Sequence, residues 1–211
     1  MRPTFSPRLI NGPFEDPGLY IPFVYQNRAI LFDLGDLSGL TNRDLLKVSH
    51  VFVTHMHMDH FIGFDTLLRL LMGRPKTLHL YGPQGFLQNV EGKLAGYTWN
   101  LVENYSESLI LEVTEVRGDQ TLRRRYRCDN RFRAESAANR PFCSVLLEEP
   151  SLNVSAIILD HGIPCLGYCL NERFHVNIRK DRLQALGLEP GSWLQVLKEA
   201  IYSEKHRDFP I

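Results

Sequence analysis

The stretch "FVTHMHMDHFIGF" (52–64) places three histidines and an aspartate within six residues, between apolar flanks. The residues just before the histidines are apolar and rich in β-branched types, which predicts a buried strand. Side chains two positions apart in a strand point the same way, so His55 and His57 are expected to project together from its end. Asp59 and His60 follow where the chain turns into a predicted helix.

These four side chains have the chemistry of metal ligands. Imidazole nitrogen suits zinc, and a carboxylate suits zinc or a harder metal such as manganese. A single histidine is usually a surface or structural residue, but three histidines and an aspartate directly after a buried strand are hard to explain in that way. The sequence therefore predicts metal binding by two ligand pairs, His55 with His57 and Asp59 with His60.

Length and composition narrow the class of protein. The 211 residues favour one domain over 1–211, and the formal net charge of zero argues against a general polyanion-binding surface, although a local basic patch stays open. The N-terminus has no apolar signal region, and no apolar run is long enough to span a bilayer. The four cysteines form no CxxC pair, which favours reduced thiols and a cytoplasmic location; Cys165 and Cys169 are expected to be small buried residues.

The hydrophobic pattern predicts strands and helices in an order typical of sheets packed on each other with helices outside, an α/β (α+β) class. The expected strands are 19–26, 28–35, 49–55, 76–83, 109–116, 143–149, 154–160 and 166–172. The expected helices are 40–48 with Thr41 as N-cap, the segment from Asp59 as N-cap to Gly73, 83–97, 179–187 and 191–201. His50 and His79 fall within strands and are expected to be structural.

Five segments carry a family resemblance. The stretch "THMHMDHFIG" (54–63) resembles the HxHxDH signature of the metallo-β-lactamase superfamily. Four further segments resemble, in order, those of ribonuclease Z, the endonuclease family that removes the 3′ trailer from precursor tRNA. They are "LFDLGD" (31–36), "LHLYGPQGF" (78–86), "LDHGIPCLGYCLNE" (159–172) and "LQALGLEPGSWLQVLKEA" (183–200). The resemblance implies a metallo-β-lactamase-like four-layer αββα sandwich, incomplete at the C-terminal end.

The resemblance also implies roles for individual residues. The implied metal ligands are His55, His57 and His161 for a first metal, and Asp59 and His60 for a second. Asp33 would steady the histidines. The implied cofactor is a pair of zinc ions, with manganese as an alternative. The implied reaction is in-line hydrolysis of an RNA phosphodiester, in which Asp59 helps to accept the proton.

The family pattern extends beyond what this chain contains. It continues with a "GDT"-like segment whose aspartate bridges the two metals, then an acid/base histidine and a last metal histidine. The present sequence finishes with "EKHRDFPI" (204–211), in which His206 and Asp208 are expected to be solvated. The expectation is a fragment, a truncated product or one half of an assembly, with a homodimer or a partner chain supplying the missing half-site.

Two basic segments are candidates for RNA contact. The arginine run 123–133 has interleaved aromatic residues, which suits phosphates and bases, but a solvated hairpin is an equal reading. The segment 172–192 corresponds to the arm that grips tRNA in the family, although a charge run is more often a soluble face. The candidate RNA-contacting residues are Arg123, Arg124, Arg125, Arg179, Lys180 and Arg182.

Three functions stay open at this point. The favoured one is a metal-dependent hydrolase of RNA that trims precursor tRNA. The second is another hydrolase of the same superfamily, acting on small phosphodiesters or esters. The third is a non-catalytic fragment that binds metal or RNA, which the absence of a bridging aspartate motivates.

Overall fold

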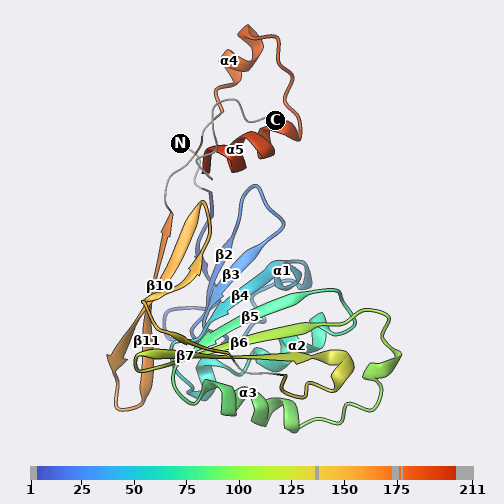
Figure 1. Ribbon diagram of the computed structural model, residues 1–211, viewed down its shortest axis with the longest axis vertical. Coiled ribbons are helices and arrows are strands. Elements are labelled where there is room, and N and C mark those ends of the chain that lie inside the picture. The colour runs from blue at the N-terminus through green and yellow to red at the C-terminus, as the bar shows by residue number, and fades with distance from the viewer. Residues whose placement is uncertain (1–3, 136–137, 173–175, 177, 203–211) are drawn as a thin grey trace.

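A mixed sheet of eight strands forms the centre of the protein, in a computed structural model that describes residues 4–135, 138–172, 176 and 178–202 (Figure 1). Strands β3 to β6 run parallel, and the pairs on either side of them are antiparallel. In spatial order the strands are β1 (Arg8–Leu9), β2 (Leu19–Pro22), β3 (Ala29–Phe32), β4 (Val48–Phe52), β5 (Thr77–Gly82), β6 (Ile110–Arg117), β7 (Gln120–Arg127) and β8 (Ala138–Pro141).

Each parallel crossover carries one helix, as parallel pairing requires. These helices are α1 (Asn42–Lys47), α2 (Phe64–Leu71) and α3 (Phe86–Ala95). They bury their apolar faces on one face of the sheet, where Leu45 of α1, Leu67 of α2 and Val90 of α3 share a core with Leu31 and Val51 of the strands. The helix layer therefore lies on a single side of the large sheet (Figure 1).

A second, three-stranded sheet covers part of the opposite face. It contains β9 (Val145–Glu148), β10 (Leu152–Asp160) and β11 (Pro164–Glu172), in the order β11-β10-β9. Because side chains alternate along a strand, Ile30 and Phe52 point away from the helices and pack against Leu152 and Val154 of the small sheet. The arrangement of helices, sheet and second sheet matches the first three layers of the predicted sandwich.

The outward face of the small sheet carries exposed apolar side chains. Ile157 is 63% exposed and Leu159 is 45% exposed, so no helix layer from the described residues covers this part of β10. The predicted incompleteness of the sandwich is consistent with this exposure. Cys169 is also exposed, opposite Ser155 in the strand register, so the prediction of burial was wrong for this thiol; Cys165 is half-buried.

Two more helices follow the sheets, in agreement with the prediction. They are α4 (Lys180–Ala185) and α5 (Trp193–Tyr202), and they lie beyond the β2–β3 end of the large sheet, apart from α1, α2 and α3 (Figure 1). The Lys198 ammonium of α5 lies 4.9 Å from the centroid of the Tyr25 ring in the β2–β3 hairpin. Short 3-10 turns occupy Met58–His60, Val102–Asn104 and Cys128–Asn130.

Several predicted bounds needed correction. Asp59 does not cap α2: it lies in a 3-10 turn, and α2 begins at Phe64 after Gly63. The arginine run does not interrupt the sheet, because residues 123–127 belong to β7 and pair with β6 along its full length. Most of the other elements start or stop within a few residues of their predicted limits, and Thr41 caps α1 as expected through a capping box. No helix among the described residues is both long and apolar enough to cross a membrane.

Candidate metal centre

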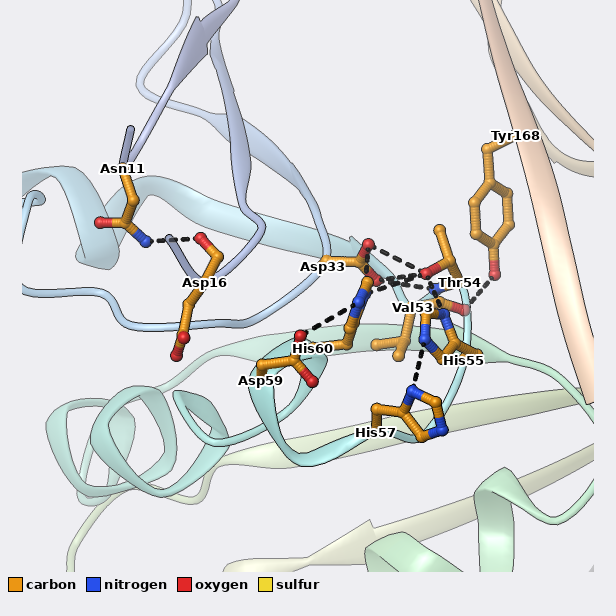
Figure 2. Close-up of polar contacts among 10 residues, drawn as sticks. All are labelled: Asn11, Asp16, Asp33, Val53, Thr54, His55, His57, Asp59, His60 and Tyr168. Atoms are coloured by element: carbon orange, nitrogen blue, oxygen red, sulfur yellow. Dashed lines mark hydrogen bonds and ion pairs between the residues drawn. The ribbon is translucent and has the colours of Figure 1, made fainter. Parts of the chain in front are cut away.

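The loop after β4 gathers the predicted ligands at the carboxyl end of the parallel strands. His55 Nε2 lies 3.1 Å from His57 Nδ1, and the rings of His55 and His60 have centroids 3.8 Å apart. Asp59 reaches His60 with an Oδ2–Nε2 distance of 3.5 Å. Figure 2 shows these side chains converging on one region from a single turn of chain.

His161 joins the cluster from the other sheet. It lies in the turn between β10 and β11, and its ring centroid is 5.1 Å from that of His55 and 6.3 Å from that of His57. Two hydrogen bonds dock β11 on the end of β4: the Leu166 N–H donates to the Thr54 carbonyl, and the Tyr168 hydroxyl donates to the Val53 carbonyl, both at 2.8 Å. The second sheet thus brings the fourth histidine to the site.

Asp33 and Thr54 hold the histidines from behind (Figure 2). Asp33 Oδ1 accepts a hydrogen bond from the Thr54 N–H at 2.7 Å, and its Oδ2 lies 3.0 Å from His60 Nδ1. The Thr54 hydroxyl contacts both carboxylate oxygens of Asp33 and also lies 3.0 Å from His55 Nδ1 and 3.2 Å from His60 Nδ1. With their Nδ1 atoms engaged, His55 and His60 keep Nε2 for another partner.

Two glycines let the Asp33 loop and the histidine loop approach closely. A Cβ on Gly63 would lie 2.4 Å from the Gly35 carbonyl oxygen, and a Cβ on Gly35 would lie 2.6 Å from the Asp59 carbonyl oxygen. The backbones are joined by hydrogen bonds from Leu34 N–H to the His60 carbonyl at 2.8 Å and from Gly63 N–H to the Leu34 carbonyl at 2.9 Å. This close contact fixes the histidine loop over the strand ends.

The surroundings of His55 favour its neutral imidazole form. Burial, with the neighbouring His60, His57 and His161, lowers the pKa of His55 to about 4. Burial raises the pKa of Asp33, against the opposing effect of its hydrogen bond from the Thr54 N–H. Neutral imidazole is the form that binds a metal.

The donor set fits zinc by its chemistry. Four imidazoles and a carboxylate are ligand types that zinc accepts, and two nitrogens on one tetrahedral zinc lie about 3.3 Å apart. The 3.1 Å between His55 Nε2 and His57 Nδ1 is close to that spacing. Within the described part of the chain, however, no three His, Cys, Asp or Glu side chains already stand in a metal-binding geometry. The structure brings the predicted side chains to one place, and their role as metal ligands stays a prediction.

The candidate RNA-contacting arginines of β7 lie away from the histidines and are paired with acids. Arg123 and Arg125 both bond Glu112, at 2.8 and 2.9 Å, and Arg124 bonds Glu91 at 2.6 Å. In the arm segment, Arg179 pairs with Asp181 on the exposed start of α4, while Lys180 and Arg182 are also exposed. His175, His206 and Asp208 lie outside the described residues.

His50 and His79 form a separate, structural pair, as predicted. Their rings stack with centroids 4.6 Å apart on the face of the sheet that looks toward the small sheet. His50 Nδ1 lies 2.9 Å from the Ser49 hydroxyl and 3.3 Å from the Arg28 guanidinium. Burial lowers the pKa of both histidines, to about 3 for His50.

Sequence reasoning missed two residues of this site, Thr54 and Tyr168. Thr54 precedes the first histidine directly, and the alternation of the strand could have placed its side chain next to Asp33. Tyr168 stands in the matched segment 159–172 but carries no metal-ligand chemistry, so only its buried hydroxyl bond to Val53 reveals its part.

The comparison with known proteins agrees with this topology. Residues 32–155 match the family model described as "Beta-lactamase superfamily domain". The match covers more than half of the chain, which therefore belongs to the beta-lactamase superfamily.

Among curated proteins, the resemblance is to ribonuclease Z. "Ribonuclease Z" of Deinococcus radiodurans is 34% identical over 173 residues, covering 80% of this chain and 52% of that protein. "Ribonuclease Z" of Pyrococcus horikoshii is 31% identical over 182 residues, covering 80% of this chain and 47% of that protein. A solved structure, the metallo-beta-lactamase fold protein YhfI from Bacillus subtilis, aligns with a TM-score of 0.48 and 15% identity over 79% of this chain and 58% of that one. The chain spans about half the length of the curated relatives it matches.

Proposed function

We propose that this chain carries the metal-binding part of a hydrolase that cleaves RNA phosphodiesters and removes the 3′ trailer from precursor tRNA. The observation that carries the proposal is the meeting of His55, His57, Asp59 and His60 with His161 from the second sheet. The identity to ribonuclease Z supports the choice of RNA as substrate.

In this proposal each residue of the cluster has a task. His55, His57 and His161 hold one zinc ion, and Asp59 and His60 contribute to a second. When bound, the metal pair supplies Lewis-acid chemistry at a phosphodiester. Asp59, 52% exposed at its side chain, would accept the proton that a water molecule loses as its oxygen bonds to phosphorus and the 3′ oxygen of the RNA leaves in line, while Asp33 holds the His60 ring in place.

The finer points of the proposal concern metal, partners and location. Zinc is preferred over manganese because four of the five donors are imidazoles. Asp59 and His60 are the ligands proposed for the second metal, and a homodimer or a partner chain is proposed as a source of further ligands. A cytoplasmic location, with precursor tRNA as substrate, follows from the same proposal.

A second candidate function is hydrolysis of a small phosphodiester. The pairing of Arg123, Arg124 and Arg125 with carboxylates favours it, because these guanidiniums are already neutralised and less able to bind a phosphate backbone. The exposed basic residues of the arm, Lys180 and Arg182, favour RNA instead.

The test is incubation of the full-length gene product with a trailer-bearing tRNA precursor and zinc or manganese. Cleavage at the trailer junction is expected, together with its loss in His57→Ala and its retention in His79→Gln, a matched histidine variant in the stacked pair outside the cluster. Cleavage of a small phosphodiester but not of the precursor selects the second candidate. No cleavage of either substrate by metal-loaded protein contradicts both.

A further inference from the structure

A cavity of about 980 Å³ lies beside α2, in the helix layer. The residues that matter for its chemistry are Asn42, Asp65, Arg69, Arg74, Tyr97 and Trp99. These six residues come from α1, from α2 and the turn after it, and from the chain that follows α3. The large sheet separates this helix layer from the small sheet. We propose that this cavity, called here the α2 groove, binds single-stranded RNA.

The charge of the α2 groove is positive. Arg69 is exposed and forms no ion pair within the described part of the chain, and Arg74 donates only from Nε to the Leu70 carbonyl at 3.0 Å. Asp65, the acid on the lining, is already bound through Oδ2 to the Lys93 ammonium at 2.6 Å. Both guanidiniums therefore stay available for phosphate oxygens, which arginine binds in a bidentate manner.

The aromatic side of the groove suits a base. Tyr97 is 48% exposed and meets Trp99 edge to face, with ring centroids 5.8 Å apart. Trp99 is held firmly, since its Nε1 donates to the Leu94 carbonyl at 2.8 Å and its ring packs on Phe132 at 4.8 Å. Fixed aromatic rings beside arginines are the combination that binds unpaired nucleotides by stacking and charge.

The position of the groove connects it with the candidate metal centre. Helix α2 begins at Phe64, four residues after His60, and its eight residues span about 12 Å. A strand of RNA that runs along α2 from Arg74 toward Asp65 is thus led toward the end of α2 that follows the histidine loop. The inference rests on the proposed function for taking RNA as the ligand, and its test measures binding without cleavage.

The experiment measures the affinity of the full chain for a fluorescein-labelled single-stranded RNA of about eight nucleotides, with chelator present so that no cleavage occurs. The double variant Arg69→Ala/Arg74→Ala is expected to bind about tenfold more weakly, and Tyr97→Leu about fivefold. The matched control is Arg133→Ala/Arg140→Ala, which removes two exposed arginines from another part of the chain and should change the affinity less than twofold.

Each result decides the matter. Equal weakening in the arginine variant and its control would mean general charge attraction and overturns the α2 groove as a site. Displacement of the RNA by AMP or inorganic phosphate alone would make it a small-ligand site and also overturns the proposal. A change of oligomeric state in the groove variants, seen by gel filtration, would make it a subunit contact. The two proposals can fail independently. A groove variant that loses RNA binding but keeps trailer cleavage, or one that keeps RNA binding but loses trailer cleavage, distinguishes this proposal from the function proposed above.

Discussion

At the scale of single residues, Thr54 connects Asp33 with two histidines of the candidate metal centre. Its hydroxyl lies within hydrogen-bond distance of Asp33, His55 and His60, and its backbone N–H is bound by the same carboxylate. Removing the hydroxyl takes away the Nδ1 partner of His55, while Asp33 still holds the His60 ring and the backbone bond to Asp33 keeps the loop in place. The orientation of the His55 ring should therefore become less well defined.

We expect Thr54→Val to lower zinc affinity by roughly 10- to 100-fold, the usual cost of losing a group that orients metal ligands. Competition with a chromophoric chelator measures the dissociation constant. Thr54→Ser keeps the hydroxyl and is the matched control, with affinity close to that of the wild type. An equal loss in both variants would contradict a specific role for the hydroxyl.

The backbone conformation of Asp33 is a feature of the candidate site that the sequence alone does not show. Its backbone has φ of 60°, a left-handed conformation that aspartate tolerates better than most residues. That turn aims the carboxylate at Thr54 and His60. Sequence alone identified Asp33 through its family motif, but the strained turn that directs the side chain is set by contacts with residues far along the chain.

At the scale of elements, the approach of the Asp33 loop to the start of α2 depends on Gly63. A Cβ there would lie 2.4 Å from the Gly35 carbonyl oxygen, although φ of −71° suits any residue. We expect Gly63→Ala to lower the free energy of unfolding by about 1–3 kcal/mol, a typical cost of overpacking. Urea denaturation followed by circular dichroism measures the change.

The control for Gly63 is a glycine with free space around it. In α3, a Cβ on Gly92 would meet nothing within 4 Å. Gly92→Ala should therefore stabilise the protein by about 0.5–1 kcal/mol, because alanine loses less backbone entropy in a helix. Equal effects of the two substitutions would contradict the close contact described between the loops.

The stacked pair of His50 in β4 and His79 in β5 predicts a pH dependence of stability. The folded-state pKa of His50, about 3, lies below the ordinary value of 6.5, so the unfolded chain takes up a proton first as the pH falls. Stability is therefore complete above about pH 6.5 and is lost as the pH falls toward about 3. Between about pH 7 and pH 5 the contribution of His50 to this loss is about 2 kcal/mol.

Replacing His50 removes that contribution. We expect His50→Gln to show a smaller drop in unfolding free energy between neutral and mildly acidic pH than the wild type, with part of the drop remaining because burial also lowers the pKa of His79. Denaturant titrations at several pH values measure both profiles. Identical profiles for the variant and the wild type would contradict a buried, neutral His50.

The elements themselves were largely predictable, for a physical reason. Buried strands such as β4 and β5 are apolar runs bounded by polar turns, and α1 begins at a capping box that can be recognised in sequence. The start of α2 was missed because Asp59 resembles a helix cap but lies in a 3-10 turn beside His60. β7 was missed because a run of arginines does not have the pattern of a strand. Arginines of β7 bond Glu112 of β6 only when the two strands pair in the sheet.

The residue types of the candidate site could be predicted from the sequence, but the contacts that hold these residues together could not. The spacing of His55, His57, Asp59 and His60 indicates a shared loop, whereas the meeting of His161 with that loop depends on two sheets packing together. The bonds that make this contact run from the Leu166 N–H and the Tyr168 hydroxyl to backbone carbonyls of Thr54 and Val53, and carbonyl acceptors leave no pattern in sequence.

At the scale of the whole molecule, the outward face of β10 predicts self-association. Ile157 and Leu159 are exposed and flank Gly167 on the neighbouring strand, which leaves a bare apolar surface. Such a surface favours contact with another protein surface. We expect the double variant Ile157→Lys/Leu159→Lys to elute as a smaller, more homogeneous species than the wild type in gel filtration.

A charge at Ser155, the next position before Ile157 on the same strand face, provides the comparison. Ser155→Lys adds a lysine on the same strand face without removing apolar area and should leave the elution of the wild type unchanged. If the wild type already elutes as a monomer at high concentration, the apolar face does not drive association.

The docking of β11 on the end of β4 also has a consequence for synthesis. His55 and His161 are separated by 106 positions, so at roughly 5–20 residues per second the second follows the first from the ribosome after roughly 5 to 20 s. During that interval the nascent chain presents His55, His57 and His60 without the histidine that arrives with the second sheet. A metal bound during that interval would have a different set of donors until the β10–β11 hairpin folds over it.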